Sequence, residues 1–262
     1  MTGIWSSSSC AGRVFMTDMN EFSKTYVLTA DKCDAQSRMP LWLITTAVIE
    51  TATLHANTLG IGYSDLITHG IGWVLSRLSV EMSRYPGVNE EYTVTTWIES
   101  INRLYSDRCF CITDASGAVV GYVRSVWAAI DMRKRCAADL SCLDLDALPI
   151  GKDRECPVAR MRRAQVDAPE SISRYTFNFS DLDFNRHVNT VQYVRHILGR
   201  FPLERFDADE VARLDISFHK ECRYGQDVDF KVRDTPDLST CDIVSADSIP
   251  AVTSALAWRP RI

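Results

Sequence analysis

Nine residues from Asp181 to Asn189, in the order Asp-Leu-Asp-Phe-Asn-Arg-His-Val-Asn, place two carboxylates, two amides and an imidazole in one short stretch. Such groups can orient one another, accept a proton and stabilise negative charge on a substrate oxygen. The stretch follows a segment with strand-like alternation and precedes apolar residues at helical spacing, namely Val191, Val194, Ile197 and Leu198. The cluster is therefore predicted at a strand-to-helix junction, where backbone N–H groups at the helix start have no intrahelical partner.

The overall composition limits the classes of function. The chain has 262 residues and a formal net charge of −5, which argues against nucleic-acid binding because that depends on basic patches. It has nine cysteines and no Cys-x-x-Cys pair, so reduced thiols in the cytoplasm fit best. No stretch is long enough to span a bilayer. The five histidines show no metal-ligand spacing, so we expect neither a metal nor another cofactor.

Periodicity predicts an α+β protein in which one plan occurs twice. Residues 1–20 lack periodicity and are expected to form a disordered leader. Residues 21–135 are expected to form a first domain with a helix over 41–59, between Pro40 and Gly60, and strands at 22–29, 72–85, 92–104, 107–114 and 118–131. Charges and prolines in 136–170 predict a linker. Residues 171–262 repeat the plan, with a helix over 189–199 and strands at 172–179, 211–223, 227–234, 240–247 and 252–258.

The two predicted helices are entered through similar polar loops. Asp34-Ala-Gln36-Ser-Arg38-Met39 can be placed against Asp183-Phe-Asn185-Arg-His187-Val188. The first copy has no imidazole, so we predict one active site per chain, in the second half. The first half would then supply walls of the substrate pocket, and Trp42, Trp73 and Met39 are candidates for its floor.

These residues resemble the signature of the acyl-acyl-carrier-protein thioesterases, which end fatty-acid synthesis in plants and bacteria. The family pattern Asp-x-Asn-x-His-Val-Asn-Asn is matched from Asp183 to Asn189, with Thr190 in place of the last Asn. A following Tyr corresponds to Tyr193, and a later Glu-Cys pair corresponds to Glu221-Cys222. The resemblance covers most of the chain from about Phe22 onward. It implies a tandem, or double, hot-dog fold, in which each half is an antiparallel sheet wrapped around a central helix.

The resemblance also implies roles for four catalytic residues. Glu221 would act as general base, or as nucleophile through a transient anhydride, and His187 would hold the water or bond to Glu221. Asn185 would position the thioester or donate to its oxyanion. Asp183 would orient Asn185 and His187. The sequence contains no Gly-x-Ser-x-Gly elbow, which excludes the α/β-hydrolase solution.

Two features near Glu221 leave alternatives open. Alternation from Leu214 through Phe218 places Glu221 on the face opposite those residues, unless a bulge near Lys220 turns the side chain. Cys222 could in principle act as a thiol nucleophile, although a buried Cys is more often a small hydrophobe.

The leading hypothesis is hydrolysis of acyl-acyl-carrier-protein thioesters to free fatty acid and holo-carrier. The alternatives are an acyl-coenzyme-A thioesterase, a hot-dog dehydratase, or a module that only binds acyl thioesters. The expected partner is an acidic acyl carrier protein, and basic runs are candidates for docking it: Arg133-Lys134-Arg135, then Arg160, Arg162 and Arg163. Contact with a membrane is not expected. Oligomeric state and preferred chain length stay open, with a homodimer as one alternative.

Overall fold

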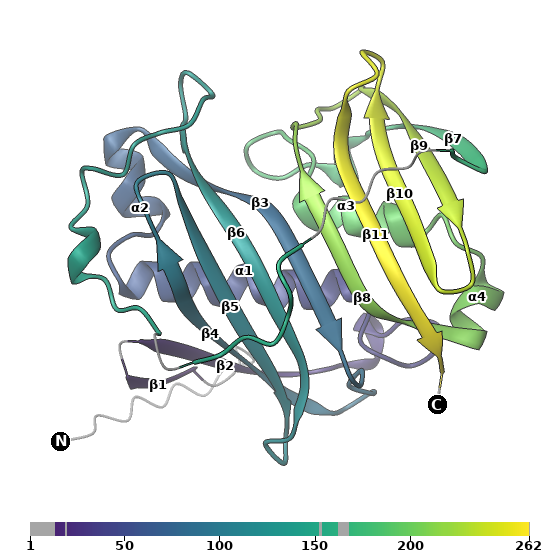
Figure 1. Cartoon of the computed structure of the whole chain (residues 1–262), viewed down its shortest axis with the longest axis horizontal. Coiled ribbons are helices and arrows are strands. Elements are labelled where there is room, and N and C mark those ends of the chain that lie inside the picture. Colours follow the sequence, from purple (N-terminus) through teal and green to yellow (C-terminus); the bar gives the residue numbers. More distant parts are fainter. Residues whose placement is uncertain (1–13, 19, 152–153, 162–167, 262) are drawn as a thin grey trace.

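A computed structural model of the chain describes residues 14–18, 20–151, 154–161 and 168–261. Within these residues, one 11-stranded sheet has the order β1-β2-β4-β5-β6-β3-β8-β11-β10-β9-β7. Figure 1 shows its two halves side by side, with the N-terminal half in purple to teal and the C-terminal half in green to yellow. All strand pairs are antiparallel. The predicted α+β class and double hot-dog arrangement are confirmed.

The first half contains β1 (Val14–Asp18), β2 (Glu21–Val27), η1 (Ala30–Lys32), α1 (Leu41–Thr58), α2 (Tyr63–Leu66), η2 (Ile67–His69), β3 (Ile71–Met82), β4 (Glu91–Ile101), β5 (Tyr105–Asp114) and β6 (Val119–Asp131). Pro40 caps the start of α1, and Gly60 takes a positive φ of 69° just after its end, as the sequence predicts. The predicted disordered leader is wrong over Val14–Asp18, because this segment pairs with β2 as strand β1, and residues 1–13 and 19 of the predicted leader lie outside the described residues.

The second half contains β7 (Ser171–Thr176), η4 (Phe179–Asp181), α3 (Thr190–Leu198), α4 (Leu203–Ala208), β8 (Asp209–Phe218), β9 (Asp227–Asp234), β10 (Leu238–Ser245) and β11 (Pro250–Pro260). Asn189 caps α3 by accepting a hydrogen bond from the backbone N–H of Val191 at 2.9 Å. Strand β8 ends five residues earlier than predicted. The structural reason is a bulge at its end, where the N–H groups of His219 and Lys220 share the carbonyl of Ala251.

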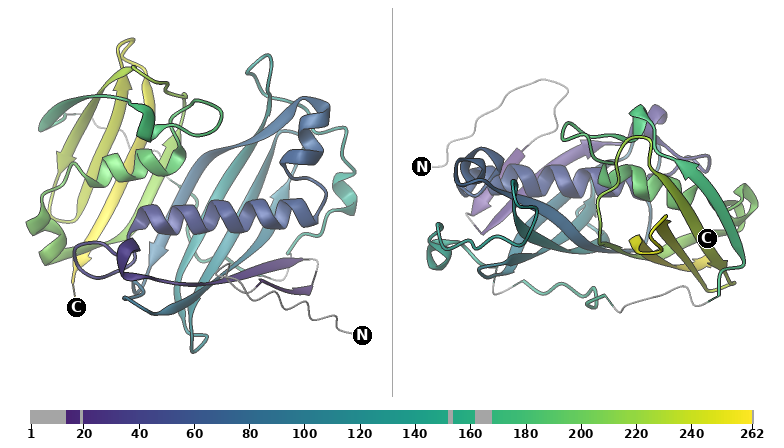
Figure 2. Two further views of the ribbon diagram at one scale, coloured as in Figure 1. Left: turned by 180° about the vertical axis from the view of Figure 1, so that it is seen from behind. Right: turned by 90° about the horizontal axis from the view of Figure 1, so that it is seen from above.

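Strands β3 and β8 join the two halves through a register that runs from Arg77 opposite Ser217 to Glu81 opposite Arg213. Helices α1 and α3 lie on one face of the continuous sheet, as Figure 2 shows from behind and from above. The predicted inner face of α1 is buried, with Ile44 and Val48 at 0% exposure. Its apolar side chains form one core with those of α3 and the sheet. Both helices therefore hold the polar loops that precede them in fixed positions over the sheet.

The described parts of the predicted linker, residues 136–151, 154–161 and 168–170, lie mainly on the opposite face of the sheet (Figure 2, right). They include η3 (Leu145–Ala147) and the buried Leu140 and Val158, and Ala159 accepts a hydrogen bond from Arg213 of β8 at 2.9 Å. Arg124 on β6 donates from Nε to the carbonyl of Val158 at 3.0 Å. These parts of the linker are a covering layer as well as a connection.

Candidate active site

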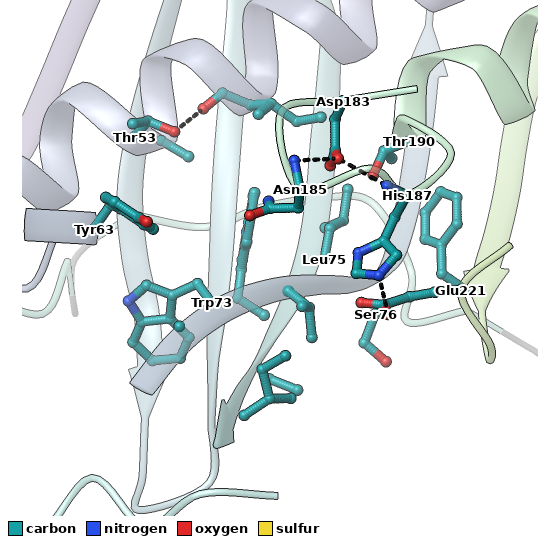
Figure 3. Close-up of a pocket in the computed structure, with 18 of the residues that line it drawn as sticks. Thr53, Tyr63, Trp73, Leu75, Ser76, Asp183, Asn185, His187, Thr190 and Glu221 are labelled. Carbon is teal, nitrogen blue, oxygen red and sulfur yellow. Dashed lines mark hydrogen bonds and ion pairs between the residues drawn. The ribbon is translucent and has the colours of Figure 1, made fainter. Parts of the chain in front are cut away.

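The loop from Asp183 to His187 is held by its own aspartate. Asp183 Oδ1 accepts hydrogen bonds from the backbone N–H groups of Asn185 at 2.8 Å and His187 at 3.1 Å. The backbone N–H of Asp183 donates to the carbonyl of His187 at 2.8 Å, and Arg186 adopts a left-handed φ of 63°. Asp183 thus fixes Asn185 and His187 through their backbone, as the dashed lines in Figure 3 show. The expected role of Asp183 applies to the loop rather than to direct contact with the imidazole ring.

The other carboxylate of the cluster, Asp181, belongs to a separate network. It is 3% exposed and accepts hydrogen bonds from the Tyr175 hydroxyl at 3.0 Å and the Asn178 backbone N–H at 2.8 Å. Its Oδ1 lies 2.7 Å from His196 Nε2. This network supports the fold of the loop from its inner side.

The imidazole of His187 faces Glu221 across the site. His187 Nε2 lies 3.5 Å from Glu221 Oε2, with the imidazole side chain 17% and the carboxylate side chain 40% exposed. Burial lowers the pKa of His187, and the positive charges of Arg135 and Arg223 lower it further. The imidazole is therefore neutral at neutral pH, when one ring nitrogen can donate and the other can accept a hydrogen bond.

A β-bulge turns Glu221 toward His187. The backbone N–H groups of His219 and Lys220 both donate to the carbonyl of Ala251, at 2.8 and 3.2 Å, which ends regular alternation at Phe218. The sequence left a bulge near Lys220 open as an alternative to regular alternation, and this pair of hydrogen bonds agrees with that alternative. Simple alternation would have given the wrong face for Glu221.

Arg135 reaches Glu221 from the other half of the molecule. It follows β6, adopts a positive φ of 56°, and pairs its guanidinium with Glu221 Oε2, the oxygen that also faces His187. From the sequence, Arg135 is predicted to belong to a carrier-docking run, and its contact with Glu221 is not predicted. The only available signal was its position in a basic turn, since no local pattern links it to a residue 86 positions away.

The four predicted catalytic residues line one cavity of about 830 Å³. The polar side comes from the second half, and most of the opposite wall comes from α1, β3 and β6 of the first half. Apolar side chains on that wall include Ile49, Ala52, Ala56, Trp73, Leu75 and Ile130. Such a cavity can hold an alkyl chain while a polar group meets Asn185 and His187 at one side.

The aromatic residues predicted to form the pocket floor divide between two places. Trp73 lines the cavity and donates from Nε1 to the carbonyl of Ile61 at 3.0 Å. Trp42 and Met39 line a different cavity beside the first junction loop, so their assignment to this floor is wrong. At the mouth, Phe184 packs edge-on against Tyr63 with ring centroids 6.0 Å apart, a contact that the sequence analysis did not anticipate.

Tyr193 and Cys222 have a shared structural role beside the site. The Tyr193 hydroxyl accepts a hydrogen bond from the backbone N–H of Cys222 at 3.0 Å, and Tyr193 also lines the cavity. Burial raises the pKa of the Cys222 thiol, which disfavours a thiolate. Cys222 is 0% exposed and does not line the cavity within the described residues, which agrees with a packing residue.

The predicted docking residues have different outcomes. Arg162 and Arg163 lie outside the described residues. Arg160 Nη2 lies 3.3 Å from Asp107 Oδ2 and 3.7 Å from Glu99 Oε2. Among the residues that the structure describes, no cluster of three or more His, Cys, Asp or Glu side chains could hold a metal ion. Nor does any described helix have the length and apolar character needed to span a membrane.

Comparison with known families identifies the group to which these residues belong. Residues 19–141 match the acyl-ACP thioesterase N-terminal domain, and residues 164–249 match the acyl-ACP thioesterase C-terminal domain. The chain belongs to the acyl-ACP thioesterase family.

Individual members of the acyl-ACP thioesterase family are distant in sequence and close in fold. A chloroplastic acyl-acyl-carrier-protein hydrolase of Cuphea viscosissima is 24% identical over 225 residues, covering 80% of this chain and 54% of that protein. An oleoyl-acyl carrier protein thioesterase of Arabidopsis thaliana is 22% identical, and the match covers 63% of its length. The chain thus spans between about half and two thirds of these two relatives.

Solved structures of thioesterases cover nearly the whole chain. An acyl-ACP thioesterase from Bacteroides thetaiotaomicron VPI-5482 superimposes with a TM-score of 0.85 at 28% identity, covering 92% of this chain and 98% of that one. The 12:0-ACP thioesterase from Umbellularia californica superimposes with a TM-score of 0.80 at 17% identity, covering 94% and 100%. The second likeness supports the double hot-dog fold of the acyl-ACP thioesterase family.

Proposed function

We propose that this protein hydrolyses acyl-acyl-carrier-protein thioesters to a free fatty acid and holo-acyl carrier protein. The main support is the cavity of about 830 Å³ in which Asn185, His187 and Glu221 meet an otherwise largely apolar wall, in a chain of this family. A thioester at the polar side would place its acyl chain along α1 and β3. The carrier would remain outside, joined through its thiol-bearing arm.

In the first step, a water oxygen attacks the thioester carbonyl carbon. Glu221 accepts the proton of this water, and neutral His187, 3.5 Å away, helps to hold the water. The C=O electron pair moves onto oxygen, and the side-chain amide of Asn185 donates a hydrogen bond to the resulting oxyanion. The Arg135 ion pair fixes the carboxylate of Glu221 beside the imidazole.

In the second step, the tetrahedral intermediate collapses and the C–S bond breaks. The thiolate leaves and takes the proton held by Glu221, which regenerates the carboxylate. Glu221 could instead attack the carbonyl and form a transient anhydride. A single turnover in H₂¹⁸O with protein in excess tests for the anhydride, because its hydrolysis at the Glu221 carbonyl leaves the label in the protein, whereas direct attack by water on the thioester never does.

The carrier would meet positive charge at the mouth of this cavity. Asp131 Oδ1 accepts the backbone N–H groups of Arg133 and Lys134, at 2.9 and 2.8 Å, so their turn is fixed close to Arg135. The Lys134 side chain is 78% exposed. Complementary charge would speed association with an acidic carrier, and salt would weaken the effect.

The test is turnover by the purified protein on acyl-acyl carrier proteins of several chain lengths, with released fatty acid measured by mass spectrometry. We expect hydrolysis by wild type and none above background by His187→Ala. Reversing Arg133 and Lys134 to Glu should raise KM for the carrier substrate more than for the matching acyl-coenzyme A. Hydrolysis of acyl-coenzyme A alone would contradict the proposed substrate.

A further inference from the structure

A second cavity of about 410 Å³ lies beside the first junction loop. It combines this loop with side chains from α3, α4 and β8 of the second half. The active-site cavity combines the second junction loop with α1 and β3 of the first half. Each cavity therefore takes its polar loop from one half of the molecule and part of its apolar wall from the other half.

The second cavity lacks the groups needed for hydrolysis but has walls suited to an alkyl chain. Gln36 and Arg38 occupy the loop positions of Asn185 and His187. Apolar side chains lining the cavity include Trp42, Leu198, Leu203 and Phe206. Leu203 is 55% exposed, a large apolar surface to leave in water. The volume is within the range of small-molecule sites, about 300–1,000 Å³.

The charge at this cavity favours an anion. The guanidinium of Arg195 lies 3.7 Å from the ring centroid of Trp42. This stacking fixes the plane of the guanidinium, and the N–H groups of Arg195 can still reach a carboxylate. Within the described residues no carboxylate forms an ion pair with Arg195. The acidic groups of the lining already have partners: Glu210 pairs with Arg259, and Asp34 accepts two backbone N–H groups of its own loop.

We propose that this second cavity binds a long-chain carboxylate. The alkyl chain would lie against Trp42, Leu198 and Phe206 beneath Leu203, and the carboxylate would take charge-assisted hydrogen bonds from Arg195. The site needs no hydrolytic residue. It rests on the proposed function only in the choice of ligand, because a fatty carboxylate is what that reaction would release.

The experiment is calorimetric titration of the 262-residue protein with laurate below its critical micelle concentration. We expect two laurate molecules per wild-type chain, one in each cavity, and one per chain in Arg195→Glu and in Leu203→Glu. Matched controls are Arg233→Glu, also at an exposed arginine, and Ile172→Glu, at a side chain 60% exposed against 55% for Leu203. Both controls should keep two. Dodecanol should bind the second cavity at least tenfold more weakly, because it cannot pair with Arg195.

Three results would overturn this site. They are no laurate bound to wild type, a wild-type laurate stoichiometry that is unchanged in both site variants, or equal affinity for dodecanol and laurate at the second cavity. Melting temperatures of all variants are measured in parallel, and the second site variant covers a failure of the first to fold. Acyl-carrier-protein hydrolysis is assayed on the same samples, so a missing activity with an intact second laurate site counts against the proposed function alone.

Discussion

The two junction loops of this molecule have the same backbone and different side chains. In the first, Asp34 Oδ1 accepts the N–H groups of Gln36 and Arg38 at 3.0 and 2.8 Å, and Ser37 has a φ of 59°. In the second, Asp183 Oδ1 accepts those of the residues two and four positions on, at 2.8 and 3.1 Å, and the residue between them has a φ of 63°. The aspartate therefore maintains the loop, and chemistry depends on the side chains that the loop presents.

The equivalence extends to the strand opposite each loop. The N–H groups of Ser83 and Arg84 both donate to the carbonyl of Val120, at 2.9 and 3.3 Å, which is the same bulge that precedes Glu221. In the first half the corresponding position is Tyr85, whose hydroxyl donates to the carbonyl of Val211 at 2.6 Å. The bulge is thus a feature of the repeated fold. The two halves differ in the side chain at this position, because the second half has a carboxylate, Glu221, which lies beside the imidazole of His187.

The largest expected effect comes from removing either group of the His187–Glu221 pair. His187→Ala and Glu221→Gln should each lower kcat by at least about 10²-fold, because general acid–base groups typically contribute about 10²–10⁴. Steady-state kinetics on an acyl-carrier-protein substrate measures this. Unchanged melting temperatures provide the control for folding, and turnover near the wild-type rate in either variant would rule out the mechanism.

A matched pair of amide substitutions tests the comparison of the two loops directly. Asn185→Ala should lower kcat by about 10²-fold, as expected when an oxyanion donor is removed. Gln36→Ala removes the equivalent amide, which donates to Asp207 Oδ1 at 2.9 Å, and should leave kcat within about twofold of wild type. Similar losses in both variants would show that hydrolysis is not confined to the second loop.

The sequence predicted most of the fold because local patterns determine its elements. The two caps, the positive-φ glycine after α1 and the alternating strands are properties of neighbouring residues, and both helices begin where their caps predict. The junction loops were aligned from sequence because their aspartates and spacing are the same. Strand β1 was missed because its five residues lie in a segment without evident periodicity.

Contacts between the halves could not be predicted in the same way. Arg135 meets Glu221, and Tyr63 meets Phe184, only because β3 pairs with β8 and aligns the two halves. The assignment of Trp42 to the acyl pocket failed because Trp42 lies in the first turn of α1, beside the first junction loop, whereas the part of α1 that lines the active-site cavity runs from Ile49 to Ala56. Local patterns therefore predict the secondary structure of each half, but they do not predict which cavity a residue lines, because that depends on how the two halves pack together.

An intermediate effect is expected for Arg135, which acts on the site from the first half. Arg135→Gln should lower kcat by about tenfold because Glu221 loses its fixed position, and Arg135→Lys should restore part of the loss. Arg135 also lowers the pKa of His187, so removing its charge should raise that pKa toward the ordinary value of 6.5. Because the proposed mechanism requires neutral His187, the acid limb of the kcat/KM profile should then move to higher pH.

The shift is measured by NMR titration of the His187 ring protons in wild type and Arg135→Gln. A purely structural role for Arg135 would lower stability without raising this pKa. Arg223 also lowers the pKa of His187, so Arg223→Gln is the matched charge control, which should shift the pKa upward while Glu221 keeps its ion pair and kcat changes less. A pKa that is unchanged in Arg135→Gln would contradict the assigned electrostatic effect.

The smallest effect on activity is expected at Cys222, where the two halves differ for a structural reason. Pro86 and Cys222 occupy equivalent positions, because their carbonyls accept the N–H groups of Met39 and Val188, each at 2.9 Å. Pro86 has no N–H to satisfy, whereas that of Cys222 donates to the Tyr193 hydroxyl. Counting from the two helix caps, Ile44 occupies the position equivalent to Tyr193. The second half therefore has a hydroxyl, that of Tyr193, at the position where the backbone N–H of Cys222 requires an acceptor.

Cys222→Ala should keep kcat within about threefold of wild type, because a buried thiol with a raised pKa supplies little thiolate. Tyr193→Phe leaves the buried N–H of Cys222 without its acceptor, which should cost about 1–3 kcal/mol of unfolding free energy. Chemical denaturation and steady-state kinetics on both variants separate stability from catalysis. If Cys222→Ala abolished hydrolysis while unfolding like wild type, the nucleophile would have to be reassigned from water or Glu221 to the thiol.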